Sequence, residues 1–255
     1  ILITSSRLAW SEAETRTITA VNGNTVSFTP GLSYPHYGST TTRTRSSDGK
    51  SWTANLRAEV GLLSRNIKIQ GDAESETAGF GGHIMVMPGS GVSGYAFIQG
   101  VELFRMGQKS ALGRYPMHWH MCAQDGAGQY FKDNAVHRSF NRAITIHGTE
   151  STLVDNNFCY DHLGHGIFLE DGSERFNVIT RNVVLGSMRP LAGEEILQTD
   201  NAFNTIQNRS PSSFWITNPN NTFTPSATTG TIGNFSIDAG GQWSYRTEGA
   251  QNQLD

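Results

Sequence analysis

Six of the eight histidines fall between Leu112 and Asp171, less than a quarter of the 255-residue chain. They are His118, His120, His137, His147, His162 and His165. Residues two apart in a β-strand point to the same side, about 6.5 Å apart, so His118 and His120 could chelate one ion. A third imidazole, from His147 on the next strand, would leave one coordination position open for water or substrate. We therefore predict one divalent metal ion, zinc or similar, on these three residues. A metal-free polar or catalytic site and a purely structural histidine ladder are the alternatives.

Two carboxylates, Glu170 and Asp171, end the strand that is expected beside these histidines. Glycoside hydrolysis needs such a pair, with one group as general acid and the other as nucleophile or base. Adjacent side chains on a strand usually diverge, so Asp161 or Asp133 could supply the second carboxylate instead. Turn carboxylates often only shape the turn. The candidate catalytic residues are Glu170, Asp171 and His165.

Basic and aromatic side chains near this cluster could bind an acidic sugar. Arg114 and Arg142 could each hold a uronate carboxylate in a bidentate contact. Tyr115 and Phe168, which we expect to be exposed, could stack on sugar rings, and packing in the fold is the alternative for each. The candidate substrate-binding residues are Arg114, Arg142 and Tyr115, and the predicted partner is an acidic, glycosaminoglycan-like polysaccharide.

A repeat in the sequence predicts how these residues are positioned. Asn134 and Asn157 lie 23 residues apart, as do His147 and Glu170. Short strands at such a period, with Asn at the turns, are typical of a solenoid, and we predict an all-β, right-handed parallel β-helix of the pectin-lyase-like kind. An ordinary β-sandwich is the alternative. The asparagines would stack as a ladder at a corner, using their tolerance of left-handed backbone geometry.

Strand alternation predicts which side chains of the repeat face the core. The residues expected to point inward are Met117, Trp119, Met121, Ile144, Ile146, Ile167 and Leu169. Those expected to point outward are His118, His120, Thr145, His147, Phe168 and Glu170. Neighbouring strands lie about 4.8 Å apart, so the repeat places His147 beside Glu170, with His120 one coil earlier.

The composition argues against several classes of partner. Charged residues make up 16% of the chain and the formal net charge is −3, which gives no indication of a nucleic-acid partner. No apolar run reaches the roughly 18 residues of a membrane span, so we expect no membrane contact by this segment. Cys122 and Cys159 could be free thiols, one disulfide, or partners of cysteines elsewhere.

The chain begins as though in the middle of a strand, so we expect a segment flanked by further domains of the same protein. Residues 17–29 read as a hairpin across an Asn-Gly turn, and residues 38–53 as a polar, turn-like stretch. We predict that the β-helix occupies residues 1–222. Residues 223–255, rich in Gly, Thr and Ser, are expected to form an irregular tail, with outer strands or a cap.

Seven blocks, in order, resemble the β-helix region shared by fibrocystin-L, the cell migration-inducing hyaluronan-binding protein and transmembrane protein 2. The blocks are Ala58-Glu-Val-Gly-Leu-Leu-Ser-Arg-Asn66, Gly81-Gly-His83, Met106-Gly-Gln108, Gly113-Arg-Tyr-Pro-Met-His-Trp-His120, Ser139-Phe-Asn-Arg-Ala-Ile-Thr-Ile-His-Gly148, Leu163-Gly-His-Gly-Ile-Phe-Leu-Glu-Asp-Gly172 and Ser213-Phe-Trp-Ile-Thr-Asn-Pro-Asn-Asn221. The resemblance covers residues 1–222, and the sequence of these blocks is more similar to the fibrocystin-L branch than to the other two.

The resemblance implies an extracellular or cell-surface β-helix, and two of the three branches are associated with hyaluronan binding and depolymerisation. Two functions therefore compete, of which we predict the first and keep the second as the alternative. The first is a module that binds a hyaluronan-like polysaccharide or plays a structural part in a large surface protein. The second is a secreted, hyaluronidase-like hydrolase, metal-assisted or dependent on Glu170, with a lyase as a subsidiary option. The fold alone does not decide between these two functions.

Overall fold

The computed structural model describes residues 1–7, 9–191, 193–196, 211–218, 220–224, 234–237 and 243–246. The chain divides into two units, one formed by Ile1–Leu62 with Pro225–Asp255 and the other by Leu63–Thr224. Helical structure in the described residues is confined to α1 (Ser75–Ala78) and the 3-10 turns η1 (Trp10–Glu12) and η2 (Gln124–Gly126). None of these helices is long and apolar enough to cross a membrane.

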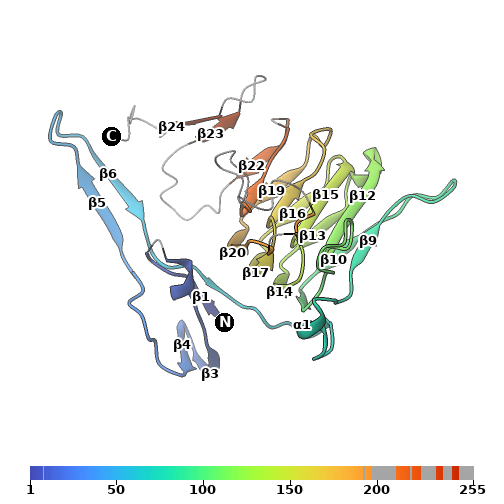
Figure 1. Cartoon of the computed structure of the whole chain (residues 1–255). Helices are drawn as coiled ribbons and strands as arrows, with labels where there is room; N and C mark the ends of the chain where they lie inside the picture. The colour runs from blue at the N-terminus through green and yellow to red at the C-terminus, as the bar shows by residue number, and fades with distance from the viewer. Residues whose placement is uncertain are drawn as a thin grey trace. The chain divides into compact units, whose positions relative to one another are not determined.

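The unit Leu63–Thr224 is a stack of coils built from three parallel, five-stranded sheets, each named here by its first strand (Figure 1). The β8 sheet contains β8 (Ile67–Gln70), β11 (Val101–Phe104), β14 (Ala135–Ser139), β17 (Phe158–Leu163) and β20 (Val183–Met188). The β9 sheet contains β9 (Ile84–Val86), β12 (Met117–Ala123), β15 (Ile144–Thr149), β18 (Ile167–Leu169) and β21 (Phe214–Trp215). The β10 sheet contains β10 (Phe97–Gln99), β13 (Tyr130–Lys132), β16 (Leu153–Asp155), β19 (Val178–Thr180) and β22 (Thr222–Thr224).

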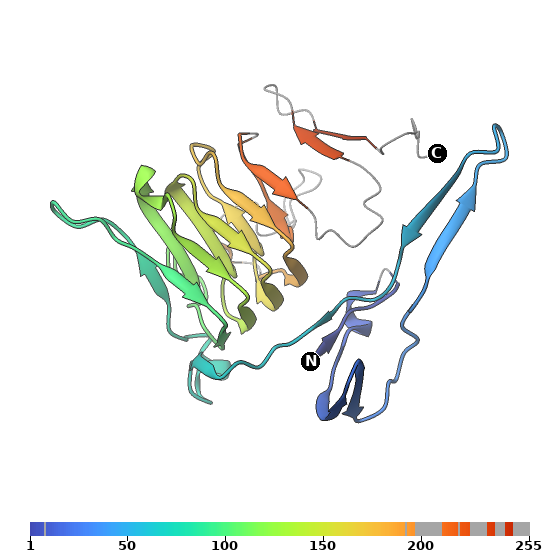
Figure 2. The ribbon, with the colours of Figure 1, turned by 180° about the vertical axis from the view of Figure 1, so that it is seen from behind.

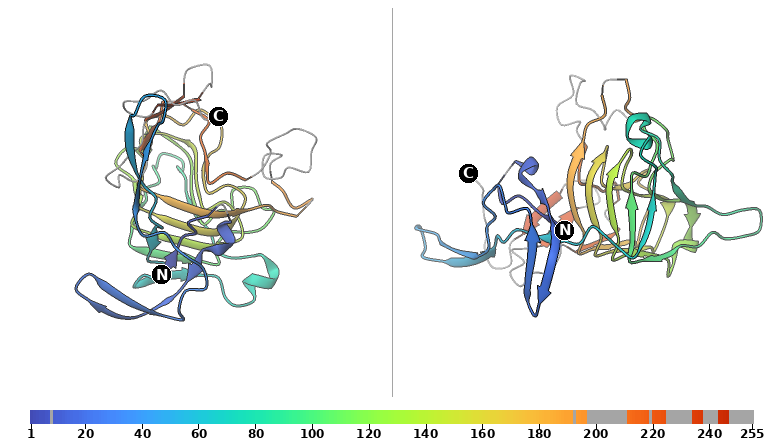
Figure 3. Two further views of the ribbon diagram at one scale, coloured as in Figure 1. Left: turned by 90° about the vertical axis from the view of Figure 1, so that its left-hand side faces the viewer. Right: turned by 90° about the horizontal axis from the view of Figure 1, so that it is seen from below.

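In each sheet, strands pair with the equivalent strands of the preceding and following coils, which confirms the predicted parallel β-helix. The coils follow one another in chain order, from green β9 and β12 through yellow to orange β22 (Figures 1 and 2). Seen from below, the strands of successive coils lie side by side (Figure 3, right). Each coil buries its inward side chains against those of its neighbours, so the core runs along the stack.

The core contains most of the side chains that strand alternation placed inside. Met117, Trp119, Ile144, Ile146, Ile167 and Leu169 are fully buried. Met121 is an exception, because it is 52% exposed. The register of β12 with β15 shifts between His120 and Ala123, and Met121 takes a positive φ of 56°, which turns its side chain away from the core.

An asparagine ladder occupies one corner of the stack, as predicted. Asn157 accepts hydrogen bonds from the backbone and side-chain amides of Asn134, at 3.0 and 3.1 Å, and Asn182 accepts the same pair from Asn157. The residues with left-handed φ are the preceding ones, Asn156 among them at 53°. The ladder therefore uses the amide groups of asparagine to satisfy buried backbone donors, and the left-handed geometry belongs to its neighbours.

Residues 1–62 contain antiparallel strands, so they contribute no coil to the β-helix that was predicted over residues 1–222. A three-stranded sheet joins β1 (Leu2–Ile3), β2 (Glu14–Thr15) and β7 (Val60–Gly61). The predicted hairpin is present as β3 (Thr17–Asn22) and β4 (Thr25–Thr29). The polar stretch predicted as turns forms a second hairpin, β5 (Thr40–Thr44) and β6 (Ser51–Asn55), in which cross-strand Thr and Ser hydroxyls bond one another.

The tail predicted over residues 223–255 lies mostly outside the described residues. Its described strands, β23 (Asn234–Ile237) and β24 (Trp243–Arg246), form an antiparallel pair.

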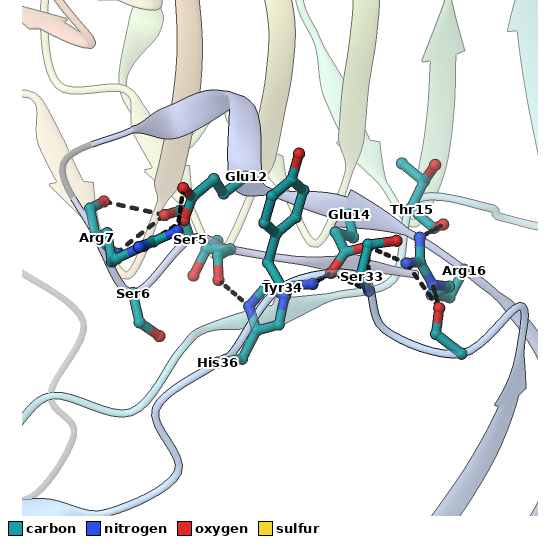
Figure 4. Close-up of polar contacts among 12 residues, drawn as sticks. Ser5, Ser6, Arg7, Glu12, Glu14, Thr15, Arg16, Ser33, Tyr34 and His36 are labelled. Atoms are coloured by element: carbon teal, nitrogen blue, oxygen red, sulfur yellow. Dashed lines mark hydrogen bonds and ion pairs between the residues drawn. The ribbon is translucent and has the colours of Figure 1, made fainter.

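A buried carboxylate organises the first unit (Figure 4). Glu14 Oε1 accepts hydrogen bonds from the amides of Ser33 and Tyr34, at 3.1 and 3.0 Å, and from Nε2 of His36 at 2.9 Å. Its Oε2 pairs with the guanidinium of Arg16. We call these five residues the Glu14 cluster; they join β2 to the segment that follows β4.

Candidate functional site

Four of the predicted site residues, His118, His120, His147 and Glu170, lie in columns on the β9 sheet, because equivalent positions of successive strands are adjacent. One column contains His118, Thr145, Phe168 and Trp215, paired across four strands. In the next column His120 is paired with His147, as the repeat predicted. Glu170 follows on the next coil, where its amide donates to the Ile146 carbonyl at 3.1 Å.

Three histidines of these columns, His118, His120 and His147, form a compact cluster that we call the histidine triad. One nitrogen from each lies within 4.8 Å of the others. The ring centroids of His120 and His147 are 4.8 Å apart, and those of His118 and His120 are 5.1 Å apart. His118 is buried, whereas the other two are partly exposed. The predicted metal ligands are therefore brought together.

Hydrogen bonds fix the orientation of two of the three rings. Nδ1 of His118 lies 2.9 Å from the Gly113 carbonyl oxygen, which can only accept, so Nδ1 carries the proton and Nε2 has the free lone pair. Nε2 of His147 donates in the same way to the Asp171 carboxylate at 2.8 Å, which leaves its Nδ1 facing Nδ1 of His120 at 3.0 Å. The lone pairs are therefore directed into the cluster.

Burial lowers the pKa of two of these imidazoles, His118 and His120. It lowers the pKa of His118 to about 4, against the opposing hydrogen bond to Gly113. Burial, and then the neighbouring His147, also lower the pKa of His120. Neutral imidazole is the form that binds metal ions.

The two predicted catalytic carboxylates have different positions. Glu170 Oε2 lies 3.8 Å from Nδ1 of His147, and its side chain is 11% exposed, whereas the Asp171 side chain is 51% exposed. Desolvation raises the pKa of Glu170, partly offset by His147. Adjacent residues do diverge, as strand geometry requires, and Asp171 instead orients His147. Asp161 and Asp133, the other predicted second carboxylates, do not line the pocket described below.

A third carboxylate, absent from the sequence prediction, holds the turn that carries Asp171. Glu174 is fully buried and accepts hydrogen bonds from three backbone amides, those of Gly148, Asp171 and Gly172, at 2.9, 3.0 and 2.7 Å. It thereby fixes the backbone beside His147 and Asp171. The spacing Asp171-Gly-Ser-Glu174 is the signal that could have indicated a carboxylate bonding back to its own turn.

A pocket of about 360 Å³ opens on the histidine triad. Glu170 and Arg114 line it together with the apolar side chains of Met85, Met87 and Leu112. Met87 and Leu112 are 52% and 64% exposed. Arg114 donates to Nε2 of His83 at 2.8 Å. The pocket thus combines a carboxylate, a cation and three imidazoles, a small set of polar groups of the kind that orients a ligand.

Tyr115 and Arg142, predicted to contact substrate, are fully buried and do not line this pocket. The Arg142 guanidinium donates to the Tyr115 hydroxyl at 2.7 Å and lies 4.4 Å from the centre of the Phe168 ring. The Tyr115 hydroxyl in turn is 3.5 Å from Glu170. These residues precede their strands by two positions and pack as a layer next to Glu170. This corrects the prediction that they touch substrate directly.

His165 and Phe168 also lie inside the structure, which corrects the expectation that Phe168 is exposed. The two rings stack with centroids 5.0 Å apart, and the Trp215 ring lies 4.7 Å from His165. Nδ1 of His165 accepts a hydrogen bond from the Ser212 amide at 3.0 Å. His165 does not line the pocket, so it is separated from the group of residues that could act together.

Comparison with known proteins gives the site a context. A family model described as CEMIP beta-helix matches residues 79–238. Fibrocystin-L of Mus musculus is 35% identical over 90% of this chain, and the protein named Cell surface hyaluronidase CEMIP2 of Homo sapiens is 36% identical over 69% of it. A G8 domain-containing protein of Dictyostelium discoideum is 38% identical over 68%. The chain spans only 6%, 15% and 14% of these three relatives.

Proposed function

This chain belongs to the CEMIP β-helix family, and on that basis we propose that it binds and hydrolyses an acidic polysaccharide of the hyaluronan type as one module of a large extracellular or cell-surface protein. The observation that carries the proposal is the pocket in which Glu170, the histidine triad and Arg114 converge. The name of one relative, a cell surface hyaluronidase, supports the choice of substrate.

Each group in the pocket has a role in this proposal. Arg114 lines the pocket and would bind a uronate carboxylate by charge-assisted hydrogen bonds. Glu170 would act as general acid, because its Oε2 is buried and has no hydrogen-bond partner among the described residues. The bond from the anomeric carbon to the glycosidic oxygen breaks, Glu170 protonates that oxygen, and a water molecule adds to the anomeric carbon and loses its proton to solvent.

Tyr115 and Arg142 support Glu170 in this proposal and do not bind sugar. Arg142 holds the Tyr115 hydroxyl, which lies 3.5 Å from Glu170 Oε1. This contact keeps one oxygen directed toward the buried layer and leaves Oε2 toward the pocket. The exposed methionine and leucine side chains at the pocket would cover the apolar faces of the sugar rings.

Binding without cleavage is the second candidate function. The observation that favours it is the match to fibrocystin-L over 90% of the chain, because the name of that relative, unlike that of the cell surface hyaluronidase, states no cleaving activity. In this alternative the same pocket and Arg114 hold the polysaccharide, and Glu170 contributes only polarity. The two candidates differ in what happens to the length of the polymer.

The test is the size distribution of high-mass hyaluronan, and of other acidic polysaccharides, after incubation with the purified chain. Shortening by wild type, with a rate about 10² to 10⁴ times lower in Glu170→Gln, would support the proposal, because general acids contribute factors of that order. The matched control is Glu150→Gln, which changes a carboxylate paired with Arg175 outside the pocket and should leave the rate unchanged.

The other outcomes are equally informative. Unshortened polymer that still binds the chain would support the second candidate. If the chain neither binds nor shortens any of these polymers, both candidates are overturned. An unsaturated, ultraviolet-absorbing product would replace hydrolysis by elimination, and Glu170 would then lose its assigned role.

A further inference from the structure

We propose that the histidine triad binds one divalent transition-metal ion, through Nε2 of His118 and Nδ1 of both His120 and His147, with Glu170 beside the open coordination position. The inference deepens the proposed function, since it assigns a metal to the same pocket. It rests on three kinds of observation: the distances within the triad, the outer hydrogen bonds of its rings, and unsatisfied polar atoms on the same face.

The distances within the triad fit a single ion. One nitrogen of each residue lies within 4.8 Å of the others, and the closest pair, Nδ1 of His120 and of His147, is 3.0 Å apart. Ligand nitrogens at about 2.0–2.1 Å from a tetrahedral zinc ion are about 3.3 Å from one another. Small rotations of the side chains therefore suffice. The ion would replace the proton that His120 and His147 otherwise share.

The outer nitrogens of two rings are bonded as in known metal sites. A histidine that ligates a metal almost always donates its other ring N–H to a carbonyl or carboxylate, which fixes the ring and raises its basicity. His118 does so to the Gly113 carbonyl, and His147 to Asp171. A ladder that only supported the fold would have no need to direct the lone pairs of both rings to one point.

Unsatisfied buried atoms gather around that point. Among the described residues, His118 Nε2, Thr145 Oγ1 and Glu170 Oε2 are buried without a hydrogen-bond partner. His118 of β12 is paired with Thr145 of β15, and Glu170 directly follows β18 in the next coil. Because buried polar atoms in native proteins are nearly always satisfied, this concentration indicates a polar occupant. An ion at the triad would satisfy His118 and leave Glu170 next to its remaining coordination position.

The donor set selects the kind of ion. Three imidazole nitrogens suit zinc, copper, nickel or iron, whereas calcium and magnesium prefer sets of oxygen ligands. The one carboxylate of the pocket is too few for a calcium site of six to eight oxygens. We therefore expect Zn²⁺ to bind and Ca²⁺ in large excess not to displace it.

The test is calorimetric titration of the chelator-stripped chain with Zn²⁺, together with the visible spectrum of the Co²⁺-loaded chain. We expect one ion per chain and a tetrahedral Co²⁺ spectrum. His120→Ala and His147→Ala should weaken binding by at least about 100-fold. Asp171→Asn removes only an outer partner and should weaken it by about 10- to 100-fold. The matched control, His83→Ala, should leave affinity unchanged, because His83 bonds Arg114 outside the triad.

Wild-type binding no tighter than that of His120→Ala, displacement of Zn²⁺ by Ca²⁺, or an octahedral Co²⁺ spectrum would each overturn the inference. Circular dichroism melting of each variant shows whether a loss of binding is a loss of fold. The result is separable from the proposed function. Zinc bound by a chain that leaves hyaluronan intact would retain the metal site and reject cleavage. If the chelator-stripped protein cleaves hyaluronan and does not bind zinc, the proposed function is retained and the metal site is rejected.

Discussion

Glu14 and Glu170 are both carboxylates buried beside a histidine, but their oxygens are used differently. In the Glu14 cluster the carboxylate accepts from two backbone amides, His36 and Arg16, and Nδ1 of His36 donates to the Thr4 carbonyl at 2.8 Å (Figure 4). Glu170 accepts one long hydrogen bond, 3.5 Å from the Tyr115 hydroxyl, and its Oε2, 3.8 Å from His147 Nδ1, accepts no hydrogen bond among the described residues. The pKa values of the two carboxyl groups accordingly shift in opposite directions.

The cause of each shift separates structure from function. Desolvation alone would raise the pKa of Glu14, but hydrogen bonds from His36, Ser33 and Tyr34 outweigh it and lower the value to about 2. At Glu170 desolvation prevails and the pKa is raised. A satisfied carboxylate has no capacity left for a ligand, whereas an unsatisfied one in a pocket does. The same residue types therefore build a structural joint in one unit and a candidate site in the other.

The sharpest contrast is expected from the same substitution in both clusters. His36→Ala removes one of the donors to Glu14 and the side-chain donor to the Thr4 carbonyl, so protection of the Ser33 and Tyr34 amides against hydrogen exchange should fall at least about tenfold. His120→Ala removes a ring whose hydrogen bond is to His147, while the bond from the Cys122 thiol to the His120 backbone carbonyl is kept, so exchange in β12 and β15 should hardly change. Peptide-resolved hydrogen-exchange mass spectrometry measures both.

Unchanged protection around Ser33 in His36→Ala would break the comparison, because the Glu14 cluster would then not be a structural joint. His137→Ala is a useful additional control. His137 bonds Glu102 at 2.9 Å on the β8 sheet, so its loss should act locally on that sheet and on neither cluster.

Acid should distinguish the two clusters next. The pKa of Glu14 is lowered from 4.5 to about 2 in the folded chain, so the carboxylate contributes stability above pH 4.5 that is lost as the pH falls toward 2. His36 and Arg16 are the basic side chains that face it. Exchange protection of residues 14–36, corrected for intrinsic rates, should therefore decrease from pH 5 to pH 3. Glu14→Gln should be less protected at pH 5 and nearly independent of pH; a parallel decrease in that variant would assign the effect elsewhere.

The site was predictable where it depended on local periodicity. Strand alternation and the 23-residue repeat were enough to place His120 beside His147 and Glu170 in the next coil. Inward Trp119 and the asparagine ladder followed from the same rules. These features depend on residues within one or two coils, where a repeat fixes the register.

The predictions that failed concern contacts between residues that are distant in sequence. Outward-facing Phe168 was expected to be exposed, but His165, Arg142 and Trp215 pack around it, and Trp215 is 47 residues away. A position on the outer face of a strand says nothing about the loops that cover it. In residues 1–62 the hairpin of residues 17–29 was predicted, but the other antiparallel strands were missed, because they are short, lack the repeat and were assigned to the β-helix.

Two threonines of the same strand offer the finest version of the comparison. Thr145 and Thr149 of β15 are both fully buried, but Thr149 Oγ1 accepts from the Cys122 amide at 3.1 Å and donates to the His147 carbonyl at 2.9 Å, whereas Thr145 Oγ1 has no partner among the described residues. Replacing a hydroxyl by a methyl group of similar shape removes a desolvation cost where it is unsatisfied and creates one where it is bonded. Thr145→Val should therefore raise the free energy of unfolding by about 1 kcal/mol, and Thr149→Val should lower it by about 1–3 kcal/mol.

Urea unfolding of the chelator-stripped chain, followed by the fluorescence of the buried tryptophan in the β9 sheet, measures both changes. A loss of stability in Thr145→Val would mean that its hydroxyl is bonded in solution, to water or an ion in the pocket, and that the unsatisfied face is already filled without added metal.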